Sequence, residues 1–271
     1  MSKCIAVASG KGGVGKSVFT ANLAAALAQN GIRVLIIDAD IGLRSQDALL
    51  SLENRVVYDL VDVAKGNCET NQAILSSESI PSLSLLPAAQ FDRAKSLDPK
   101  KLAKVIQSLR NSYEYIFIDC PAGIERGLRN VLNAGTDEIF LIVTPDDISI
   151  RSAERAVQLM NEKKASRPLL IVNRLDSNLI RSGEMLPART VAQILDLQLF
   201  GAVPEDQIVY RALLRHDLLM HYDCESRNAV MRIAARIRGE NIPVHEYGEK
   251  KRLIDRLFQR KLKEVSSIDD H

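Results

Sequence analysis

The chain alternates short apolar runs with longer stretches in which apolar and polar positions recur at helical spacing. Most of the short runs are apolar throughout rather than at every second position, as expected for strands that are covered on both faces. We predict strands at residues 4–9, 33–38, 83–86, 115–119, 138–143, 169–173 and 199–203. We predict helices at residues 16–30, 99–111, 125–134, 149–163, 187–196 and 225–238.

This order of elements predicts the fold class. Strands that alternate with helices favour an α/β fold, with a doubly wound, mostly parallel sheet of about seven or eight strands and helices on both faces. No internal repeat, low-complexity tract or linker rich in Pro and Gly divides the pattern. We therefore expect one domain over residues 1–240, followed by an amphipathic helix over residues 249–265 and a polar tail over residues 266–271.

The composition narrows the possible functions. The 271 residues are 46% hydrophobic and carry a net charge of +2, which is typical of a soluble globular protein. The chain has no Trp and only 4% aromatic residues, which argues against an aromatic platform for nucleic acid. Cys4, Cys68, Cys120 and Cys224 show no metal-ligand spacing and indicate a reducing compartment. Neither a signal peptide nor an apolar run of about 18 residues is present, so we expect a cytoplasmic protein.

A glycine-rich segment, SGKGGVGKSVF, follows the first predicted strand. Its residues 10–17 fit the pattern G-x-x-x-x-G-K-[ST], in which backbone N–H groups and a helix N-terminus surround phosphates. We expect Lys16 to contact the β- and γ-phosphates of a nucleotide and the Ser17 hydroxyl to bind Mg²⁺. A plain glycine turn is the alternative. The predicted nucleotide-binding residues in this segment are Gly10, Lys11, Gly12, Gly13, Val14, Gly15, Lys16, Ser17 and Val18.

Aspartates at the ends of two predicted strands complete this site. Asp38 ends the second strand, Asp40 follows it, and Asp119 ends the strand at residues 115–119. Ligands of doubly wound sheets bind at the carboxyl ends of the strands, so these side chains belong near the phosphates. We predict that Asp40 and Asp119 act in catalysis and help Ser17 to hold Mg²⁺, and that Asp38 contributes to nucleotide binding. A helix N-cap is the alternative role for each aspartate.

The segment KGGVGKS, residues 11–17, resembles the deviant Walker A motif of the ParA/MinD family of P-loop ATPases, which is marked by the extra lysine. In that family the early lysine reaches the partner's phosphates across a nucleotide-sandwich dimer. The resemblance therefore implies that Lys11 is catalytic together with Lys16, in an ATP-dependent homodimer. Further segments are similar to the MinD branch of the family: DADIGLR (38–44), RVVYDLVDVAKG (55–66), NQAIL (71–75), LLPAAQ (85–90), DCPAGIE (119–125) and VPEDQIVYRA (203–212).

This resemblance implies a function. It indicates an ATPase that cycles on and off the membrane, hydrolyses ATP to ADP and phosphate, and regulates where the division septum forms. Its cofactors would be ATP and Mg²⁺, and its partners a MinC-like division inhibitor and a MinE-like activator. The resemblance also puts four residues near the adenine base: Asn173, Pro204, Glu205 and Asp206.

The chain departs from the family pattern at two pairs of residues. Ser17-Val18 stands where the family commonly has Thr-Thr, so the Mg²⁺ hydroxyl remains but a second hydroxyl is lost. Ser45-Gln46 stands where Asn-Leu is usual, in the region expected to position the attacking water. We expect the ATPase class to hold, and the sequence leaves the turnover rate open.

Residues 249–265, EKKRLIDRLFQRKLKEV, form the predicted amphipathic helix, with seven Lys/Arg and three Asp/Glu. Its net charge of +4 leaves −2 for the rest of the chain, since the whole carries +2. A basic amphipathic helix is typical of a membrane surface, and docking on its own domain is the alternative. The predicted membrane-binding residues are Lys250, Lys251, Leu253, Ile254, Arg256, Leu257, Phe258, Arg260 and Leu262. We expect attachment to the inner face of the cell membrane when ATP is bound.

Two other functions stay open on sequence alone. One is a ParA-like ATPase that positions DNA or other cargo, in which the basic tail would contact nucleic-acid phosphates. The slightly acidic charge outside the tail makes DNA an unlikely partner. The other is a weakly hydrolysing nucleotide switch of the flagellar-number type, for which the two departures leave room.

Overall fold

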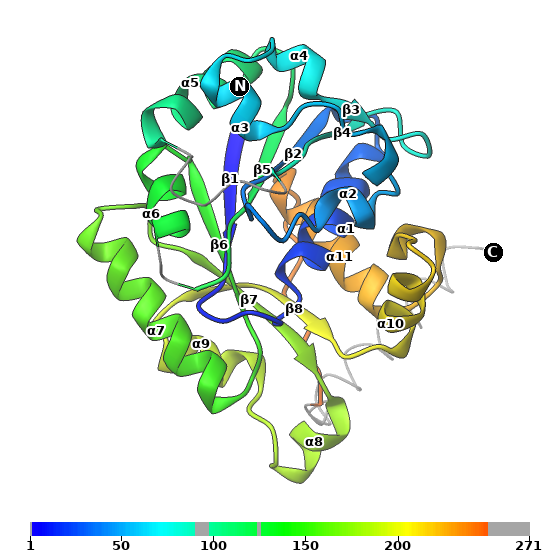
Figure 1. The fold of residues 1–271 in the computed structure, drawn as a ribbon. Helices are drawn as coiled ribbons and strands as arrows, with labels where there is room; N and C mark the ends of the chain where they lie inside the picture. Colours follow the sequence, from blue (N-terminus) through cyan, green and yellow to red (C-terminus); the bar gives the residue numbers. More distant parts are fainter. Residues whose placement is uncertain (1, 90–97, 124–125, 249–271) are drawn as a thin grey trace, which may run out of the picture.

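The structure, a computed structural model, describes residues 2–89, 98–123 and 126–248. Within this part of the chain, eight strands form one sheet in the order β3-β4-β2-β5-β1-β6-β7-β8 (Figure 1). Neighbouring strands are parallel, except that β3 is antiparallel to β4. The strands are β1 (Lys3–Ala8), β2 (Val34–Asp38), β3 (Leu75–Ser76), β4 (Leu83–Leu86), β5 (Tyr115–Asp119), β6 (Glu138–Val143), β7 (Leu169–Leu175) and β8 (Gln198–Pro204).

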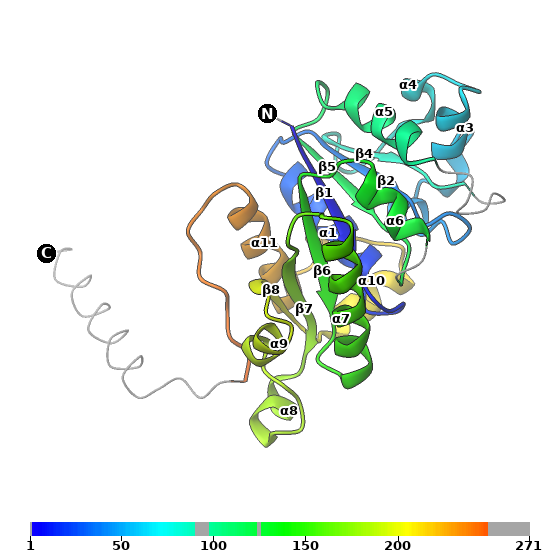
Figure 2. The same ribbon diagram turned by 90° about the vertical axis from the view of Figure 1, so that its left-hand side faces the viewer.

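Helices cover both faces of the sheet (Figure 2) and enclose two hydrophobic clusters that share β1. Cys4, Ala6 and Ala8 belong to the first cluster, with apolar residues of α3 (Leu60–Lys65), α5 (Pro99–Leu109), α6 (Arg126–Asn133), α7 (Asp147–Glu162) and α9 (Ala188–Ile194). Ile5 and Val7 belong to the second, with apolar residues of α1 (Lys16–Ala28) and α11 (Glu225–Ile237). Successive residues of a strand face opposite sides of the sheet, so β1 is buried on both. This burial explains why residues 4–8 of β1 are apolar at every position.

The doubly wound α/β prediction is confirmed, and the seven predicted strands and six predicted helices are all present in the described part of the chain. The edge strand β3 and the helices α2, α3, α4, α8 and α10 have no counterpart in the prediction. Each is too short to show a clear period, and helices below about 12 residues depend on capping and packing. The helices are α1 (Lys16–Ala28), α2 (Gln46–Leu49), α3 (Leu60–Lys65), α4 (Thr70–Ala73), α5 (Pro99–Leu109), α6 (Arg126–Asn133), α7 (Asp147–Glu162), α8 (Ser177–Ser182), α9 (Ala188–Ile194), α10 (Gln207–Leu214) and α11 (Glu225–Ile237), with 3-10 turns at Glu53–Arg55 and Leu219–His221.

After α11 the chain packs back onto the domain as far as Tyr247, whose side chain is buried. The Tyr247 hydroxyl donates a hydrogen bond to Glu225 at 3.0 Å, and Arg232 donates to the Tyr247 oxygen at 2.8 Å. The packed chain therefore continues beyond residue 240. The predicted amphipathic helix at residues 249–265 and the polar tail at 266–271 lie outside the described residues.

Candidate functional site

The predicted phosphate-binding residues lie at the carboxyl edge of the sheet, where β1, β2 and β5 end close together. The sheet order places β5 between β2 and β1. Asp38 at the end of β2 is the register partner of Asp119 at the end of β5, and Val7 of β1 lies opposite Asp119. The glycine-rich segment follows β1 and leads directly into α1. The topology thus brings three segments together that are far apart in the sequence.

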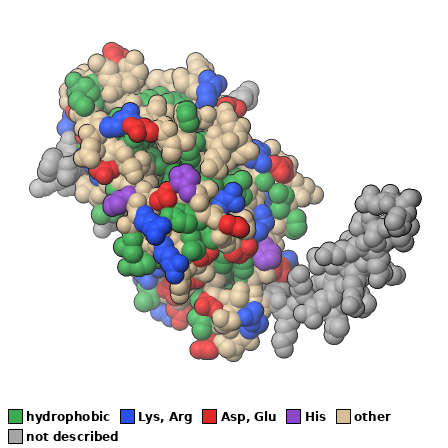
Figure 3. Space-filling model, turned by 90° about the vertical axis from the view of Figure 1, so that its right-hand side faces the viewer, with side chains coloured by type: hydrophobic (Ala, Val, Ile, Leu, Met, Phe, Trp, Pro, Cys, Tyr) green, Lys and Arg blue, Asp and Glu red, His purple; other side chains and the backbone are tan. Residues whose placement is uncertain are grey.

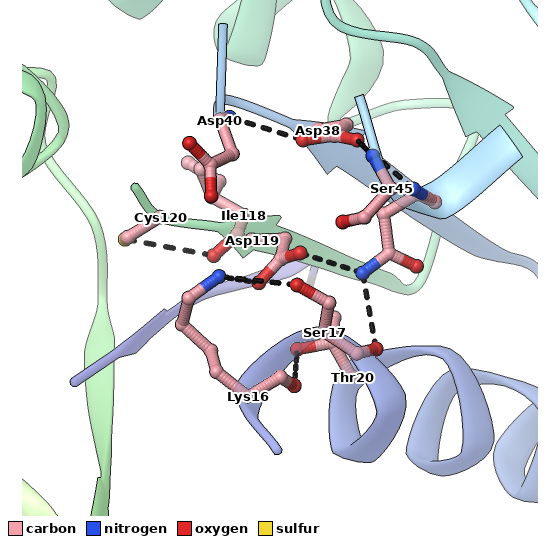
Figure 4. Close-up of polar contacts among 10 residues, drawn as sticks. Lys16, Ser17, Thr20, Asp38, Asp40, Ser45, Ile118, Asp119 and Cys120 are labelled. Carbon is pink, nitrogen blue, oxygen red and sulfur yellow. Dashed lines mark hydrogen bonds and ion pairs between the residues drawn. The ribbon is translucent and has the colours of Figure 1, made fainter. Parts of the chain in front are cut away.

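Lys16 and Asp119 form a buried ion pair at the start of α1 (Figure 4). The Lys16 ammonium donates to Asp119 Oδ1 at 2.5 Å and lies 3.3 Å from the Ser17 hydroxyl oxygen. Burial is the largest influence on the pKa of Lys16 and lowers it, but the adjacent Asp119 carboxylate outweighs burial and holds that pKa above its usual value. Lys16 therefore stays protonated, which a phosphate-binding lysine requires.

The Asp38 carboxylate organises the loop that follows β2. It is fully buried and accepts hydrogen bonds from the backbone N–H groups of Asp40 at 3.0 Å, Ser45 at 3.1 Å and Gln46 at 3.1 Å. Burial, and then the charge of Asp119, raise the pKa of Asp38, while the backbone hydrogen bonds act in the opposite direction. Asp38 thus holds residues 40–46 against the site.

Asp40 is partly exposed and lies in the electrostatic field of the ion pair. Partial burial is the main cause that raises its pKa, Lys16 lowers it and Asp119 raises it further. A carboxyl group with a raised pKa beside a phosphate-binding loop is suited to position a water or accept a proton. The catalytic role of Asp40 stays a prediction.

Gln46, the first residue of α2, belongs to the site although sequence reasoning gave it no role there. Its side chain is fully buried, and its amide nitrogen donates to Asp119 Oδ2 at 2.6 Å and to the Ser17 carbonyl oxygen at 3.1 Å. The signal for it was the departure from the family pattern at this position. A long polar side chain among buried residues needs hydrogen-bond partners, and Gln46 finds them in Ser17 and Asp119, two of the predicted site residues.

A cavity of about 570 Å³ opens beside Gly15 and the first turns of α1. Its lining includes the four residues predicted to lie near adenine, Asn173, Pro204, Glu205 and Asp206, together with Arg174 and Tyr210. The Asn173 amide donates to the Val14 carbonyl oxygen at 2.8 Å, which connects β7 to the glycine-rich segment. Small-molecule sites commonly have about 300–1,000 Å³, so the cavity has room for a nucleoside next to the phosphate-binding loop.

Lys11 lies apart from the buried ion pair. Its ammonium is 3.6 Å from Asp146 Oδ1, and both side chains are substantially exposed, at 41% and 47%. Asp146 also caps α7, because its side chain accepts a hydrogen bond from the Ser149 N–H. An exposed ion pair of this kind contributes about 0–1 kcal/mol. Lys11 can therefore leave Asp146 for another partner at small cost.

The side chains at this edge suit Mg²⁺. Asp40 and Asp119 supply carboxylate oxygens and Ser17 supplies a hydroxyl, the hard oxygen donors that Mg²⁺ prefers. Among the described residues, no three His, Cys, Asp or Glu side chains form a metal-binding group of their own. Mg²⁺ usually keeps several waters and binds through one or two carboxylates and substrate phosphates, so a complete protein cage is not needed.

The glycine-rich segment packs directly on α7 at Gly10. A Cβ added there would lie 2.1 Å from the Ser152 carbonyl oxygen, which belongs to helix backbone and cannot turn away. We expect Gly10→Ala to lower the free energy of unfolding by about 1–3 kcal/mol and to weaken nucleotide binding, because α7 and the loop must separate. Thermal unfolding and the binding of a fluorescent ADP measure the two effects.

Gly12→Ala is the matched control for this substitution. A Cβ on Gly12 would meet its nearest neighbour, the Ala122 Cβ, at 3.8 Å, an ordinary contact. This variant should keep the melting temperature of the unsubstituted protein. Equal melting temperatures for the two variants would contradict the close packing on α7.

Comparison with known proteins gives matches over nearly the whole chain. The family model described as ParA, NUBPL iron-transfer P-loop NTPase, matches residues 1–237. The septum site-determining protein MinD of Helicobacter pylori is 41% identical over 259 residues, which cover 93% of this chain and 96% of that protein.

Solved structures agree with these matches. A chain of the MinC:MinD cell division protein complex from Aquifex aeolicus superimposes with a TM-score of 0.84 and 37% identity, covering 92% of this chain and 100% of that chain. The septum site-determining protein MinD complexed with Mg-ADP from Pyrococcus horikoshii OT3 superimposes with a TM-score of 0.76 and 29% identity, covering 88% and 96%.

Proposed function

This chain belongs to the ParA family of P-loop NTPases, and within it to the septum site-determining MinD proteins, and from this premise we propose that it is an ATPase that regulates where the division septum forms. The observation that carries the proposal is the buried Lys16–Asp119 pair at the start of α1, beside a cavity large enough for a nucleoside. A lysine, a serine and an aspartate at these places are the parts that phosphate transfer requires.

Different residues of the chain bind the phosphates, Mg²⁺ and the adenine base. Backbone N–H groups of residues 10–17 and the N-terminus of α1 bind the phosphates, and Lys16 turns from Asp119 to the β- and γ-phosphates. Ser17, Asp119 and Asp40 would hold Mg²⁺, which would neutralise charge on the phosphates. The part of the cavity lining that includes Asn173 contacts the adenine base. The Mg-ADP complex of the Pyrococcus horikoshii relative supports this assignment of nucleotide and metal.

Asp40 is proposed to position the attacking water. We expect the unsubstituted protein to release phosphate from ATP in the presence of Mg²⁺, and Asp40→Ala to do so about 10²–10⁴-fold more slowly. Because Lys16 and the backbone N–H groups of residues 10–17 remain to bind the phosphates, the variant should still bind ATP and dimerise with it. Phosphate release and sedimentation with a non-hydrolysable ATP analogue measure these two properties.

Asp40→Asn distinguishes the effect of the Asp40 charge from the effect of its side-chain size in the same assay. It keeps the size of the side chain and removes the proton acceptor, so its rate should fall as that of Asp40→Ala does. Hydrolysis near the unsubstituted rate in both variants would remove Asp40 from the mechanism. No phosphate release by the unsubstituted protein, with lipid vesicles present, would favour a nucleotide switch with little hydrolysis.

Dimerisation and membrane attachment complete the proposal. Lys11, exposed and weakly paired with Asp146, supports a role across the interface of an ATP-dependent homodimer. In the described part of the chain, no helix has the length and apolar character to cross a lipid bilayer. We assign membrane attachment to residues 249–265 because their sequence is basic and amphipathic, which would make the protein peripheral on the inner face of the membrane.

Partners are proposed from the relatives. The Aquifex aeolicus structure is a complex of MinC with MinD, which supports a MinC-like division inhibitor as a partner of this chain. A MinE-like activator of hydrolysis is the corresponding proposal for the step that ends membrane attachment.

The competing functions have less support. Basic and acidic side chains are interspersed on the face drawn in Figure 3, whereas a DNA-positioning ATPase is expected to carry a basic patch. The name of the matching family model includes iron transfer, but Cys4 and Cys120 are buried, and burial raises the pKa of the Cys4 thiol to about 12. Thiols held in the neutral form are poor metal ligands.

A further inference from the structure

The side chain of Gln46 is buried in a way that packing alone does not explain. Its amide oxygen is buried and accepts no hydrogen bond from the described residues. A buried acceptor without a partner lowers stability, and leucine of similar volume would avoid that loss. The amide nitrogen, which donates two hydrogen bonds, is therefore the group that explains a glutamine at this position.

The contacts of Gln46 define its orientation. Both partners of its amide nitrogen, Asp119 Oδ2 at 2.6 Å and the Ser17 carbonyl oxygen at 3.1 Å, are acceptors, so the NH₂ group must face them. At its other end, the Gln46 backbone N–H donates to Asp38 at 3.1 Å. Gln46 thus connects the loop after β2, the end of β5 and the first turn of α1.

Asp119 depends on this connection once a nucleotide binds. Its buried carboxylate has a donor on each oxygen, Lys16 on Oδ1 and Gln46 on Oδ2. When Lys16 turns to the phosphates, Gln46 is the partner that remains. A charged acceptor with a short, well-anchored donor keeps its orientation better than one that is free to rotate.

We propose that Gln46 is a positioning residue for Mg²⁺, which orients Asp119 and ties it to Ser17 so that both groups face one ion. The inference rests on the proposed function, because it assigns the metal to Ser17 and Asp119. Hydrogen-bond partners of metal-binding groups commonly change metal affinity or activity about 10–100-fold when they are removed.

The test is the Mg²⁺ requirement of nucleotide binding by the full chain. In the first titration, fluorescent ADP is added to the protein in EDTA. In the second, Mg²⁺ is added at a fixed concentration of fluorescent ADP. We expect Gln46→Leu to raise the Mg²⁺ concentration at half-maximal enhancement of ADP binding about 10-fold or more. Binding in EDTA should weaken much less than binding with Mg²⁺, because the Lys16 ammonium contacts Asp119 and Ser17 but not Gln46. Gln46→Met, which also lacks the amide, should give the same result and replaces Gln46→Leu if that variant does not fold.

Leu49→Ala is the matched control. Leu49 lies in the same short helix and packs against the second hydrophobic cluster. This variant should lower the melting temperature and leave the Mg²⁺ requirement unchanged.

Two results would overturn the role of Gln46: an unchanged Mg²⁺ requirement in Gln46→Leu, or equal weakening of ADP binding with and without Mg²⁺. Absence of Mg²⁺-dependent binding in the unsubstituted protein would instead overturn the proposed function, and this role with it.

Discussion

Lys11→Ala is expected to abolish ATP-dependent dimerisation and to slow hydrolysis about 10²–10³-fold, while ATP binding to the monomer is retained. We assign ATP binding within one subunit to Lys16, which lies at the start of α1 and contacts Asp119. Lys11 lies at the exposed rim, where its ammonium is 3.6 Å from Asp146, whereas the buried Asp119 is paired with Lys16. Its charge is therefore available to phosphates bound by a second copy of the chain.

The physical reason is the charge that develops during phosphoryl transfer. A cation delivered from a partner stabilises that charge only after the partner has docked, so hydrolysis waits for dimerisation. Without the Lys11 ammonium, two bound triphosphates face each other with less compensating charge, and the dimer itself is destabilised. One substitution thus removes both properties.

Three measurements on the same sample separate these effects. Fluorescent ATP analogues report binding, sedimentation with a non-hydrolysable analogue reports dimerisation, and phosphate release reports turnover. A Lys11→Ala variant that still dimerised with ATP and hydrolysed it normally would show that the second lysine has no role across the interface.

Asp146→Asn is the matched control for Lys11→Ala. It removes the carboxylate that faces Lys11 and keeps the N-cap of α7, because Asn caps helices about as well as Asp. If Lys11 acts toward a partner subunit, this variant should dimerise and hydrolyse ATP as before.

Leu257→Glu or Phe258→Glu is expected to abolish ATP-dependent sedimentation with vesicles of anionic lipid. Half-burying six apolar side chains of residues 249–265 contributes about 5–8 kcal/mol. Each basic residue near anionic lipid adds about 1 kcal/mol. Ordering some 14 residues costs on the order of 1 kcal/mol or more apiece, so one helix binds with a net free energy near zero. A charged side chain on the apolar face makes this net binding free energy unfavourable.

Dimerisation makes such a weak helix useful. Two linked helices bind the same membrane with an affinity gain on the order of 10²-fold or more, without any new contact. ATP should therefore promote sedimentation with vesicles, whereas ADP or the absence of nucleotide should not.

Gln259→Glu is the matched control for the tail. It adds the same charge within the same segment, at a position that helical spacing predicts to be opposite Leu257, so it should weaken vesicle binding only slightly. Sedimentation that ignores ATP, or that survives both substitutions on the apolar face, would exclude the membrane switch. ATP-dependent and salt-sensitive retention of duplex DNA would favour the DNA-positioning alternative instead.

The strands and long helices were predictable because their patterns repeat over many residues. Residues 116–118 of β5 are all apolar because the strand is buried on both faces, and that requirement is visible in the sequence. The short helix α10 was not predicted. It starts where Asp206 accepts a hydrogen bond from the Ile208 N–H, and its eight residues show too little of a period.

The fold class, the glycine-rich segment predicted to bind phosphates and the aspartates that end β2 and β5 could all be read from the sequence. Local spacing is enough for these, because the segment and its helix are continuous in the chain and parallel strands end at the same edge of a sheet. The pairing of oxygens and donors is visible only in the folded chain: Lys16 with Asp119, Asp38 with the backbone of residues 40–46, and Gln46 with both Asp119 and Ser17. These pairs join segments up to 103 residues apart, and a buried polar group takes its partner from whatever packing brings within about 3 Å.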